Sequence, residues 1–256
     1  MEITNKTAFI TGGASGLGLA TARSIVEGGG NVMLFDLDGD RAGTAANILG
    51  ERALFAAGDV TDETQVQAAI DATVARFGTI HINVNCAGIG GAGKTVSRAG
   101  PLPLEQFSRV VRINLIGTFN VLRLCAAVMQ QNPLSETEEE RGVIINVASV
   151  AAFDGQVGQA AYSASKGGIA AMTLPITRDL AAQAIRVMTI APGLFETPML
   201  AALPQEVKDS LGAMPQFPKR LGTPEEFAQM AASIIRCSYL NGETIRLDAG
   251  IRMAAR

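Results

Sequence analysis

Short runs of apolar and β-branched residues alternate along the chain with longer segments of helical periodicity. From Leu17 to Ile25, apolar or small residues recur at i, i+3, i+4, i+7 and i+8, which predicts an amphipathic helix that ends at Gly28 to Gly30. This helix lies between two strand-like runs, so the first unit is predicted to be βαβ. In all, seven strands are predicted: Thr7–Ile10, Asn31–Phe35, Leu54–Ala57, Ile80–Asn85, Val143–Val147, Arg186–Ile190 and Thr244–Leu247.

Strand-like and helix-like segments alternate through most of the chain. The strand-like runs are apolar throughout and do not alternate between apolar and polar residues. Such runs are typical of a parallel sheet covered on both sides by helices. We therefore expect a single α/β domain over residues 1–256, a doubly wound (Rossmann) seven-stranded parallel sheet with helices on both faces. Three stretches break the alternation and are predicted to be loops or insertions: Gly90–Pro103, the acidic stretch Asn132–Arg141, and the proline-rich stretch Pro192–Pro224. We expect the acidic stretch to be a solvated loop and the proline-rich stretch to close over the substrate.

Composition narrows the classes of function. Apolar residues make up 48% of the chain and charged residues 18%, the net charge is −3, and the basic residues are scattered. These values suit one compact domain and argue against a nucleic-acid or membrane partner. No apolar stretch approaches the roughly 20 residues of a membrane span, and we expect no signal or transit peptide before the first strand. We expect a cytoplasmic protein that acts on a small molecule.

The cysteines and the histidine content argue against metal chemistry. Cys86, Cys125 and Cys237 lie far apart among apolar or small residues, so we predict three buried free thiols in a reducing compartment. The chain has one histidine and no C-x-x-C or H-E-x-x-H spacing. We therefore predict no metal site.

A glycine-rich tract, Thr11–Gly18, follows the first predicted strand, and the next helix is expected to begin at about Gly16. Glycine permits a tight turn and lets main-chain N–H groups approach a pyrophosphate at the helix N-terminus. The tract is related to G-x-G-x-x-G but is spaced differently, and a glycine cluster alone is a weak signal. Its place between a strand and a helix favours a dinucleotide site that includes Gly12, Ser15, Gly16, Leu17 and Gly18.

Asp36 ends the second predicted strand at eighteen residues after Gly18, close to the offset of roughly 20 residues expected for an acidic ribose anchor. Its carboxylate can accept hydrogen bonds from ribose hydroxyls and would repel a 2′-phosphate. The glycine tract contains no arginine or lysine to neutralise such a phosphate. We therefore predict NAD rather than NADP. The alternative is that Asp36 only caps the turn before Asp38 and Gly39.

Tyr162 and Lys166 are candidate catalytic residues, because they lie at i and i+4 on one face of a predicted helix. A free tyrosine has a pKa of about 10, and lowering it by about three units takes roughly 4 kcal/mol. A nearby ammonium and a positively charged nicotinamide can supply that stabilisation of the phenolate. Ser149, at the carboxyl end of the fifth predicted strand, is placed to hold the substrate oxygen. We predict that Tyr162 moves the proton and that Ser149 orients and polarises the substrate.

Along its whole length the chain resembles the short-chain dehydrogenase/reductase family. The resemblance implies that Asn114, Ser149, Tyr162 and Lys166 form a catalytic tetrad, with Asn114 holding a water that links Lys166 to solvent. It also implies that Tyr162 and Lys166 contact the cofactor. Cys86 stands where the family's tract has a second asparagine, which puts a side-chain hydrogen bond there in doubt. The remaining cofactor positions that the resemblance implies are Asp59, Val60, Cys86, Ala87, Gly88, Pro192, Gly193, Phe195 and Thr197.

A narrower resemblance is to one subgroup of that family, the type II 3-hydroxyacyl-CoA dehydrogenases. It is carried by Ser149–Tyr162, Met172–Ile176, Ala191–Phe195 and Leu240–Glu243. It implies hydride transfer between NAD and the 3-hydroxyl of a short acyl-CoA thioester, a substrate contact by Gln159, and a homotetramer. Lys94 and Arg98 could meet CoA phosphates, but surface solvation is the favoured explanation, so they are left out of the predicted site.

Other functions stay open. Within the same reaction class the substrate could be a steroid or another secondary alcohol, or a 3-oxoacyl carrier protein, whose reductases usually prefer NADPH. From a different class, the chain could be a non-enzymatic NAD-binding scaffold. The intact Ser149, Tyr162 and Lys166 argue against that as its sole role, because a scaffold has no need of an activated phenol.

Overall fold

A seven-stranded parallel sheet forms the centre of the molecule, in the order β3-β2-β1-β4-β7-β8-β9. The computed structural model describes residues 1–134, 139–197 and 205–255. The order reverses between β1 and β4, which is the arrangement of a doubly wound sheet. The prediction of fold class is therefore confirmed. The strands of this sheet are β1 (Thr7–Thr11), β2 (Asn31–Asp36), β3 (Ala53–Ala57), β4 (Ile82–Asn85), β7 (Gly142–Val147), β8 (Ile185–Pro192) and β9 (Thr244–Leu247).

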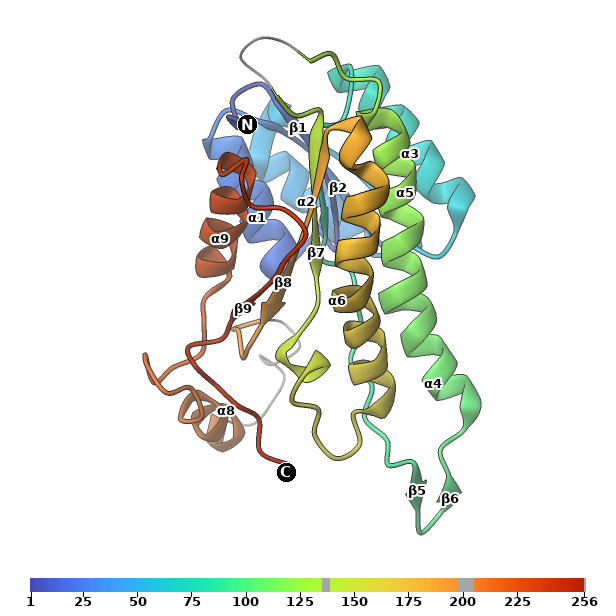
Figure 1. The fold of residues 1–256 in the computed structure, drawn as a ribbon, viewed down its shortest axis with the longest axis vertical. Coiled ribbons are helices and arrows are strands. Elements are labelled where there is room, and N and C mark those ends of the chain that lie inside the picture. Colours follow the sequence, from blue (N-terminus) through green and yellow to red (C-terminus); the bar gives the residue numbers. More distant parts are fainter. Residues whose placement is uncertain (135–138, 198–204, 256) are drawn as a thin grey trace.

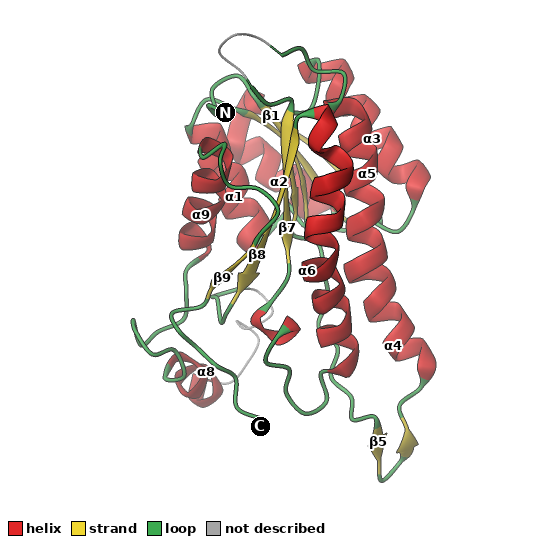
Figure 2. Ribbon diagram, in the orientation of Figure 1, coloured by secondary structure: helices red, strands yellow, loops and turns green. Residues whose placement is uncertain are grey.

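Helices cover both faces of the sheet and bury two separate apolar clusters (Figure 2). Alternate strand residues point to opposite faces, so Ile10 packs with one cluster and its neighbour Phe9 with the other. One face is covered by α1 (Gly16–Glu27), α2 (Gly39–Leu49) and α9 (Pro224–Arg236), and the other by α3 (Glu63–Phe77), α5 (Gly117–Met129) and α6 (Ala160–Leu180). Figure 1 shows β7 and β8 between these two layers.

The seven predicted strands agree with the structure to within one or two residues at each end, and the first helix begins at Gly16 as predicted. The irregular stretches contain more structure than the sequence indicates. Residues 90–103 hold a small hairpin of β5 (Val96–Ser97) and β6 (Gly100–Pro101), and the proline-rich stretch contains α8 (Gln205–Gly212). Part of that stretch, residues 198–204, lies outside the described residues.

Residues 104–129 form one long helical rod, built from α4 (Leu104–Val111), a π-helical turn at Arg112–Ile116, and α5. By length and mean hydropathy alone, the rod is long and apolar enough to cross a membrane. Half of its most apolar window is buried inside the protein, and α5 packs against β4, β7 and α3. The rod is therefore a core helix of the domain over much of its length.

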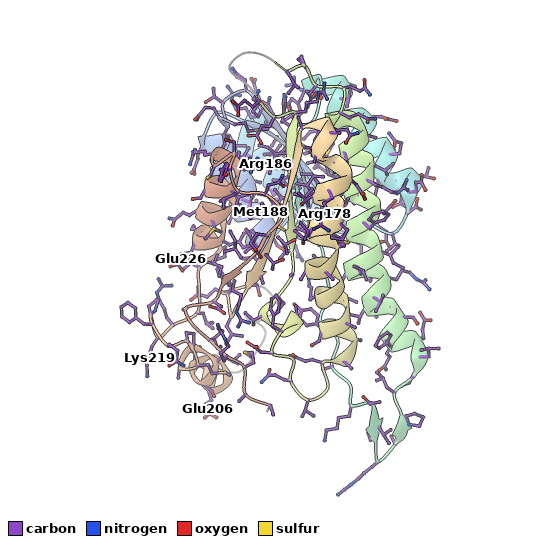
Figure 3. All side chains as sticks on the ribbon, in the orientation of Figure 1. Arg178, Arg186, Met188, Glu206, Lys219 and Glu226 are labelled. Carbon is purple, nitrogen blue, oxygen red and sulfur yellow. The ribbon has the colours of Figure 1, made fainter. Side chains whose placement is uncertain are left out.

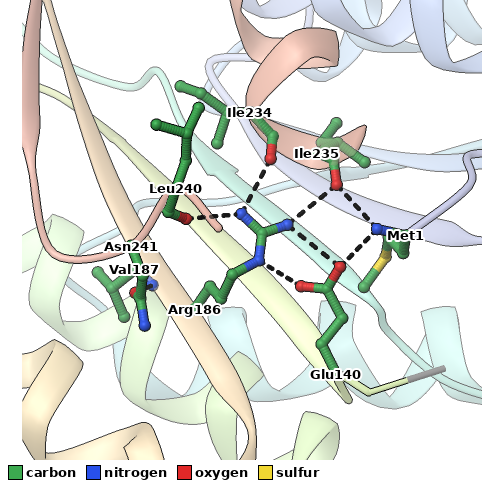
Figure 4. Close-up of polar contacts among 8 residues, drawn as sticks. All are labelled: Met1, Glu140, Arg186, Val187, Ile234, Ile235, Leu240 and Asn241. Carbon is green, nitrogen blue, oxygen red and sulfur yellow. Dashed lines mark hydrogen bonds and ion pairs between the residues drawn. The ribbon is translucent and has the colours of Figure 1, made fainter. Parts of the chain in front are cut away.

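The prediction of a solvated acidic stretch is wrong at Glu140. The carboxylate of Glu140 forms a buried ion pair with the guanidinium of Arg186 on β8 (Figure 4). Figure 3 places Arg186 on the interior part of β8, whereas Glu206 and Lys219 lie at the outside of the molecule. The guanidinium also donates, at 2.9 Å in each case, to the carbonyls of Ile234, Ile235 and Leu240. Glu136 and Glu138 lie outside the described residues.

The thiols differ in exposure. Cys125 is buried, as predicted, and desolvation raises its pKa well above the ordinary value. Cys86 is only half-buried and Cys237 is exposed at the end of α9, so the prediction of three buried thiols is wrong for these two. Small and apolar neighbours in sequence do not ensure burial, because Cys237 follows the last turn of a helix rather than facing the sheet.

Candidate active site

A cavity of about 630 Å³ opens at the carboxyl ends of the strands, where parallel sheets of this type bind ligands. Its volume suits a small-molecule site. Of the residues predicted to form the site, Asn114 alone does not line this cavity. The predicted residues that do are Gly12, Ser15, Gly16, Leu17, Gly18, Asp36, Asp59, Val60, Cys86, Ala87, Gly88, Ser149, Gln159, Tyr162, Lys166, Pro192, Gly193, Phe195 and Thr197.

The glycine tract makes one end of the cavity by bringing strand and helix into close contact. Gly12 has a φ of 62°, which favours glycine, and a Cβ on Gly18 would lie 2.2 Å from the carbonyl oxygen of Gly12. The turn therefore needs glycine at both positions. Because the first main-chain N–H groups of α1 have no partner within the helix, they can donate to an anion at this end.

Asp36 caps the turn after β2 and also lies at the cavity. Its carboxylate accepts hydrogen bonds from the N–H of Ala14 at 3.0 Å and from the N–H of Asp38 at 3.1 Å, so it stabilises the glycine tract and the turn after β2. The same residue lines the cavity. A carboxylate has about four lone-pair sites, so acceptor capacity is left for ribose hydroxyls.

The middle of the cavity is formed by the ends of β3 and β4. Asp59 is fixed by hydrogen bonds to Gln65 and Thr61, which places Val60 beside it with the side chain almost fully buried. After β4, the N–H of Ala87 donates to the hydroxyl of Thr11 at 3.1 Å. The N–H of Cys86 donates to the carbonyl of Thr11 at 3.2 Å, so the turn is held through its own main-chain N–H groups and does not need an asparagine side chain.

Ser149 and Tyr162 both line the cavity, and the interaction of the Ser149 hydroxyl with the phenol acts to lower the pKa of Tyr162. Ser149 also accepts from the N–H of Ala151 at 3.1 Å, which caps a short 3-10 turn and fixes the hydroxyl. Burial raises the pKa of Tyr162, and the interaction with Ser149 opposes that effect only in part. The protein alone thus favours the neutral phenol.

Lys166 is buried beneath Tyr162, with its Nζ atom 5.9 Å from the centre of the tyrosine ring. The Nζ atom donates to the carbonyl of Val147 at 2.7 Å. Desolvation lowers the pKa of Lys166 to about 8, although the thiol of Cys86 acts in the opposite direction. The ammonium is therefore held close to the phenol in an environment where its charge is poorly solvated.

Asn114 lies in the π-helical turn of residues 112–116 and is completely buried. Its side chain pairs with both main-chain groups of Ile89 and donates to the hydroxyl of Ser165, at 2.8 to 3.0 Å. A Cβ on Gly88 would lie 3.2 Å from the Asn114 amide oxygen and 3.5 Å from Lys166 Nζ, so Asn114 and Lys166 meet behind the same turn. In this geometry Asn114 holds the turn after β4 in position; its role in a proton relay stays a prediction.

Several residues that line the cavity were not predicted, among them Ile89, Arg109, Leu194 and Met253. Arg109 lies on α4 and is exposed. Arg98 lies in the turn of the β5–β6 hairpin and Lys94 lies two residues before β5, and neither lines the cavity. A helical spacing of i, i+4, i+5 connects Arg109 with Ile113 and Asn114, and this signal could have identified Arg109. No local signal identifies Met253, because it reaches the cavity only through the path of the chain after β9.

The cradle fits NAD. Gly12 and Gly18 leave no space for side chains at the tight turn, α1 offers main-chain donors, and Asp36 offers acceptors at the expected distance along the sheet. A model of the short chain dehydrogenase family matches residues 6–208 of the chain. The chain belongs to the short-chain dehydrogenase family. It is therefore an oxidoreductase that uses NAD(H).

The family's members named 3-hydroxyacyl-CoA dehydrogenase type-2 are close relatives. The protein of that name from Bos taurus is 56% identical over 248 residues, which cover 96% of this chain and 95% of the relative. The one from Homo sapiens is 54% identical with the same coverage. The crystal structure of 3-hydroxyacyl-CoA dehydrogenase type-2 from Mycobacterium avium is 39% identical, with a TM-score of 0.94 and 98% coverage of both chains.

A second solved structure bears on the cofactor. The 3-ketoacyl-(acyl-carrier-protein) reductase from Brucella melitensis, complexed with NADH, is 30% identical to this short-chain dehydrogenase. Its TM-score is 0.85, and the comparison covers 98% of this chain and 100% of that one. The NADH in that relative agrees with the cofactor predicted from Asp36.

Proposed function

We propose that the enzyme interconverts 3-hydroxyacyl-CoA and 3-oxoacyl-CoA thioesters with short acyl chains, a reaction of fatty acid metabolism. The observation that carries the proposal is the convergence of Ser149 and Tyr162 on one cavity, with Lys166 beneath the tyrosine ring. The names of the relatives from Bos taurus and Homo sapiens supply the substrate class. Arg109 at the cavity supports it further, because a guanidinium there suits the phosphates of CoA.

Ser149 and Tyr162 have different tasks. Ser149 donates a hydrogen bond to the substrate oxygen and holds it against the phenol of Tyr162. In reduction, Tyr162 gives its proton to the developing alkoxide; in oxidation, its phenolate takes the hydroxyl proton. The chemistry that bound nicotinamide supplies is donation or acceptance of the hydride at the carbon that bears this oxygen.

Burial favours one direction of this proton transfer. Because burial raises the pKa of Tyr162, the phenol is protonated at neutral pH and ready to act as the acid in ketone reduction. Oxidation needs the phenolate, which the Lys166 ammonium stabilises from 5.9 Å below the ring centre. Lys166 is thus a positioning and electrostatic residue whose charge matters most in the oxidative direction.

A second candidate is reduction of a 3-oxoacyl carrier protein, which is favoured by the relative from Brucella melitensis. The cofactor does not separate the two candidates, because that relative was solved with NADH. What separates them is the carrier attached to the same acyl group.

The test compares carriers. Purified enzyme is given NADH and acetoacetyl-CoA, acetoacetyl carrier protein, acetoacetyl-pantetheine or a 17-ketosteroid, and NADH consumption is followed at 340 nm. We expect kcat/KM to be highest for acetoacetyl-CoA. With NADPH in place of NADH, kcat/KM should be at least about tenfold lower, a difference of about 1.4 kcal/mol, because the carboxylate of Asp36 repels the 2′-phosphate. Higher kcat/KM for the carrier protein or the steroid would overturn the proposed substrate. No turnover of any of the four would favour the scaffold.

We also propose that copies of the chain form a homotetramer, in which α5 and α6 pack against the same helices of a second copy. Ile116 and Phe119 on the rod, and Leu174 on α6, are large apolar side chains that remain 44 to 54% exposed. Phe119 also lines a shallow groove between the two helices. Light scattering should give four times the mass of the 26.6 kDa chain, and a monomer would contradict the proposal.

A further inference from the structure

The chain that follows β9 returns to the active site. At Gly193, beside the cavity, a Cβ would lie 2.9 Å from the Cα of Asp248, so the two main chains are in close contact. The N–H of Gly193 donates to the carbonyl of Leu247 at 2.9 Å, and Ile251 is 1% exposed. The segment 248–255, which we call the return segment, therefore begins firmly packed against the turn at the end of β8. Figure 1 shows it running toward the end of the molecule where α8 lies.

Arg246 connects the return segment to the loop that carries Ser149. Its guanidinium donates to Asp154 at 2.6 Å, to Asp248 at 2.7 Å and to the carbonyl of Ile251 at 2.9 Å. Asp154 lies only five residues after Ser149. The side chains of the Arg246–Asp154 ion pair are each about one-fifth exposed. The Arg246 hydrogen bond lowers the pKa of Asp154, so this ion pair is maintained at neutral pH.

A second set of contacts fixes the far part of the return segment. The side chain of Gln156 donates to the carbonyl of Ala254, and the N–H of Val157 donates to the carbonyl of Ala255, both at 3.0 Å. Gln156 in turn contacts Gln159, which lines the cavity three residues before Tyr162. Between the two sets of contacts lies Met253, whose half-buried side chain lines the cavity.

We propose that Met253 is a specificity-determining residue that limits the length of the acyl chain, and that Arg246 is the positioning residue that holds it there. The inference rests on the proposed function, since it names the part of the thioester that Met253 meets. The carbonyl oxygen of the substrate is fixed at Ser149 and Tyr162, so the groups on its two sides must point in opposite directions. CoA is charged and hydrated and has to extend to solvent, which leaves the alkyl end for an apolar wall. A thioether side chain is such a wall, and its flexibility accommodates short chains of differing shape.

The main experiment changes the wall and measures chain length. For Met253→Ala, we expect the ratio of kcat/KM for 3-oxooctanoyl-CoA to that for acetoacetyl-CoA to rise about tenfold, the effect of a few methylenes in an apolar pocket. Met230→Ala is the matched control, because Met230 is also half-buried but packs on α9 away from the cavity. Its ratio should stay at the wild-type value. An unchanged ratio in Met253→Ala would overturn the role of Met253. So would an equal change in kcat/KM for both CoA thioesters, because that effect would not depend on the length of the acyl chain.

The same series of chain lengths, offered as 2-alkanones from butanone to octanone, separates this inference from the proposed function. If the wild type reduces ketones but not acyl-CoA, the proposed substrate is wrong. The role of Met253 is then tested by whether Met253→Ala raises the ratio of kcat/KM for octanone to that for butanone. If it reduces acyl-CoA and the ratio does not respond to Met253→Ala, the proposed substrate stands and the inference fails. Turnover of neither series overturns both.

A further pair of variants tests Arg246. Arg246→Met should give the same direction of change in chain preference as Met253→Ala, with the Kd for NADH within about twofold of wild type, and Arg246→Lys should restore part of the preference. Trypsin should cut after the exposed Arg252 at least about fivefold faster in Arg246→Met, as mass spectrometry would show. Should Arg246→Met not fold, Asp154→Asn breaks the same contact. Wild-type preference and cleavage rate in a folded variant would show that Arg246 does not position the segment.

Discussion

Lys166 and Arg186 are both cations inside the protein, each 5% exposed, and they lie on adjacent elements, α6 and β8. Their surroundings differ. Arg186 has a carboxylate, Glu140, and three main-chain carbonyls, and the main-chain amine of Met1 also donates to Glu140. Lys166 has the carbonyl of Val147 and the face of Tyr162. Burial lowers the pKa of Lys166 to about 8.

The difference shows how one fold uses buried charge in two ways. At the amino end of β8, each polar atom of the guanidinium fork has a partner, so the charge is compensated and joins β8, α9 and the segment before β7 (Figure 4). At the carboxyl end of the sheet, no carboxylate among the described residues forms an ion pair with the Lys166 ammonium, so its field is available to the phenol. A compensated charge stabilises structure, and an uncompensated one changes a neighbour's acidity.

The largest effect is expected at the reactive end. Tyr162→Phe removes the proton donor but keeps the ring above Lys166, so we expect kcat/KM for acetoacetyl-CoA to fall by about 10³-fold or more. The Kd for NADH and the midpoint of thermal unfolding should change little. NADH consumption measures kcat/KM, fluorescence titration measures the Kd for NADH, and a thermal melt followed by circular dichroism measures the midpoint. Turnover within tenfold of wild type would remove Tyr162 from the reaction.

The next effect is on stability at the compensated end. Arg186→Met leaves Glu140 inside the protein without its guanidinium, and breaking such a pair costs about 3–5 kcal/mol. Urea unfolding should therefore show a correspondingly lower free energy of unfolding. The folded fraction should keep wild-type kcat, because no atom of Arg186 lines the cavity.

The matched control is an ion pair at the surface. In Arg41→Met, the substitution removes a partner of Asp38, and both side chains are about half exposed. We expect a cost of about 0–1 kcal/mol. A similar cost for Arg186→Met would mean that the buried pair contributes no more than a surface one.

A smaller effect is expected from the pH dependence of stability at Lys166. The pKa of Lys166 is about 8 in the folded protein against 10.5 unfolded, so above pH 8 the unfolded chain binds more protons and folding becomes more favourable as pH rises. Lys166→Met lacks this contribution. Between pH 8 and 9.5, the free energy of unfolding of the wild type should rise relative to Lys166→Met by about 2 kcal/mol. A difference that stays constant or falls over this range would show that the ammonium is well solvated.

The sequence predicted the reactive end well and the compensated end poorly, for a physical reason. Tyr162, Lys166, Ser149 and the glycine tract form local patterns, because a helical spacing and the end of a strand fix where such side chains point. The strand ends were also close, since apolar runs define the buried part of the sheet. These features need no knowledge of which distant segments meet.

The failures at Glu140 and Met253 depend on distant contacts. Glu140 follows three acidic or polar neighbours and is indistinguishable from them until β8 supplies Arg186. Met253 lies in no periodic pattern of residues. The segment that carries it is joined to the Ser149 loop by the contact between Arg246 and Asp154, which are 92 residues apart. The π-helical turn at Asn114 also has no clear sequence signal. Polar residues in loops thus need the tertiary structure before their burial can be assigned.

The smallest expected effect is that of salt on the cost of Arg186→Met. It distinguishes a buried Glu140–Arg186 pair from the solvated loop predicted for the acidic stretch. Salt screens exposed charges over about 10 Å at 0.1 M and acts much less on buried ones. If the Glu140–Arg186 pair is buried as the structure has it, the cost of Arg186→Met should change by less than about 0.5 kcal/mol between 0.05 and 0.5 M NaCl. The measurement is a set of urea titrations of both proteins at each salt concentration, with the Arg41 variant as the exposed reference. A cost for Arg186→Met that halves at high salt would place Glu140 in solvent, and the contrast between the two cations would then lie in Lys166 alone.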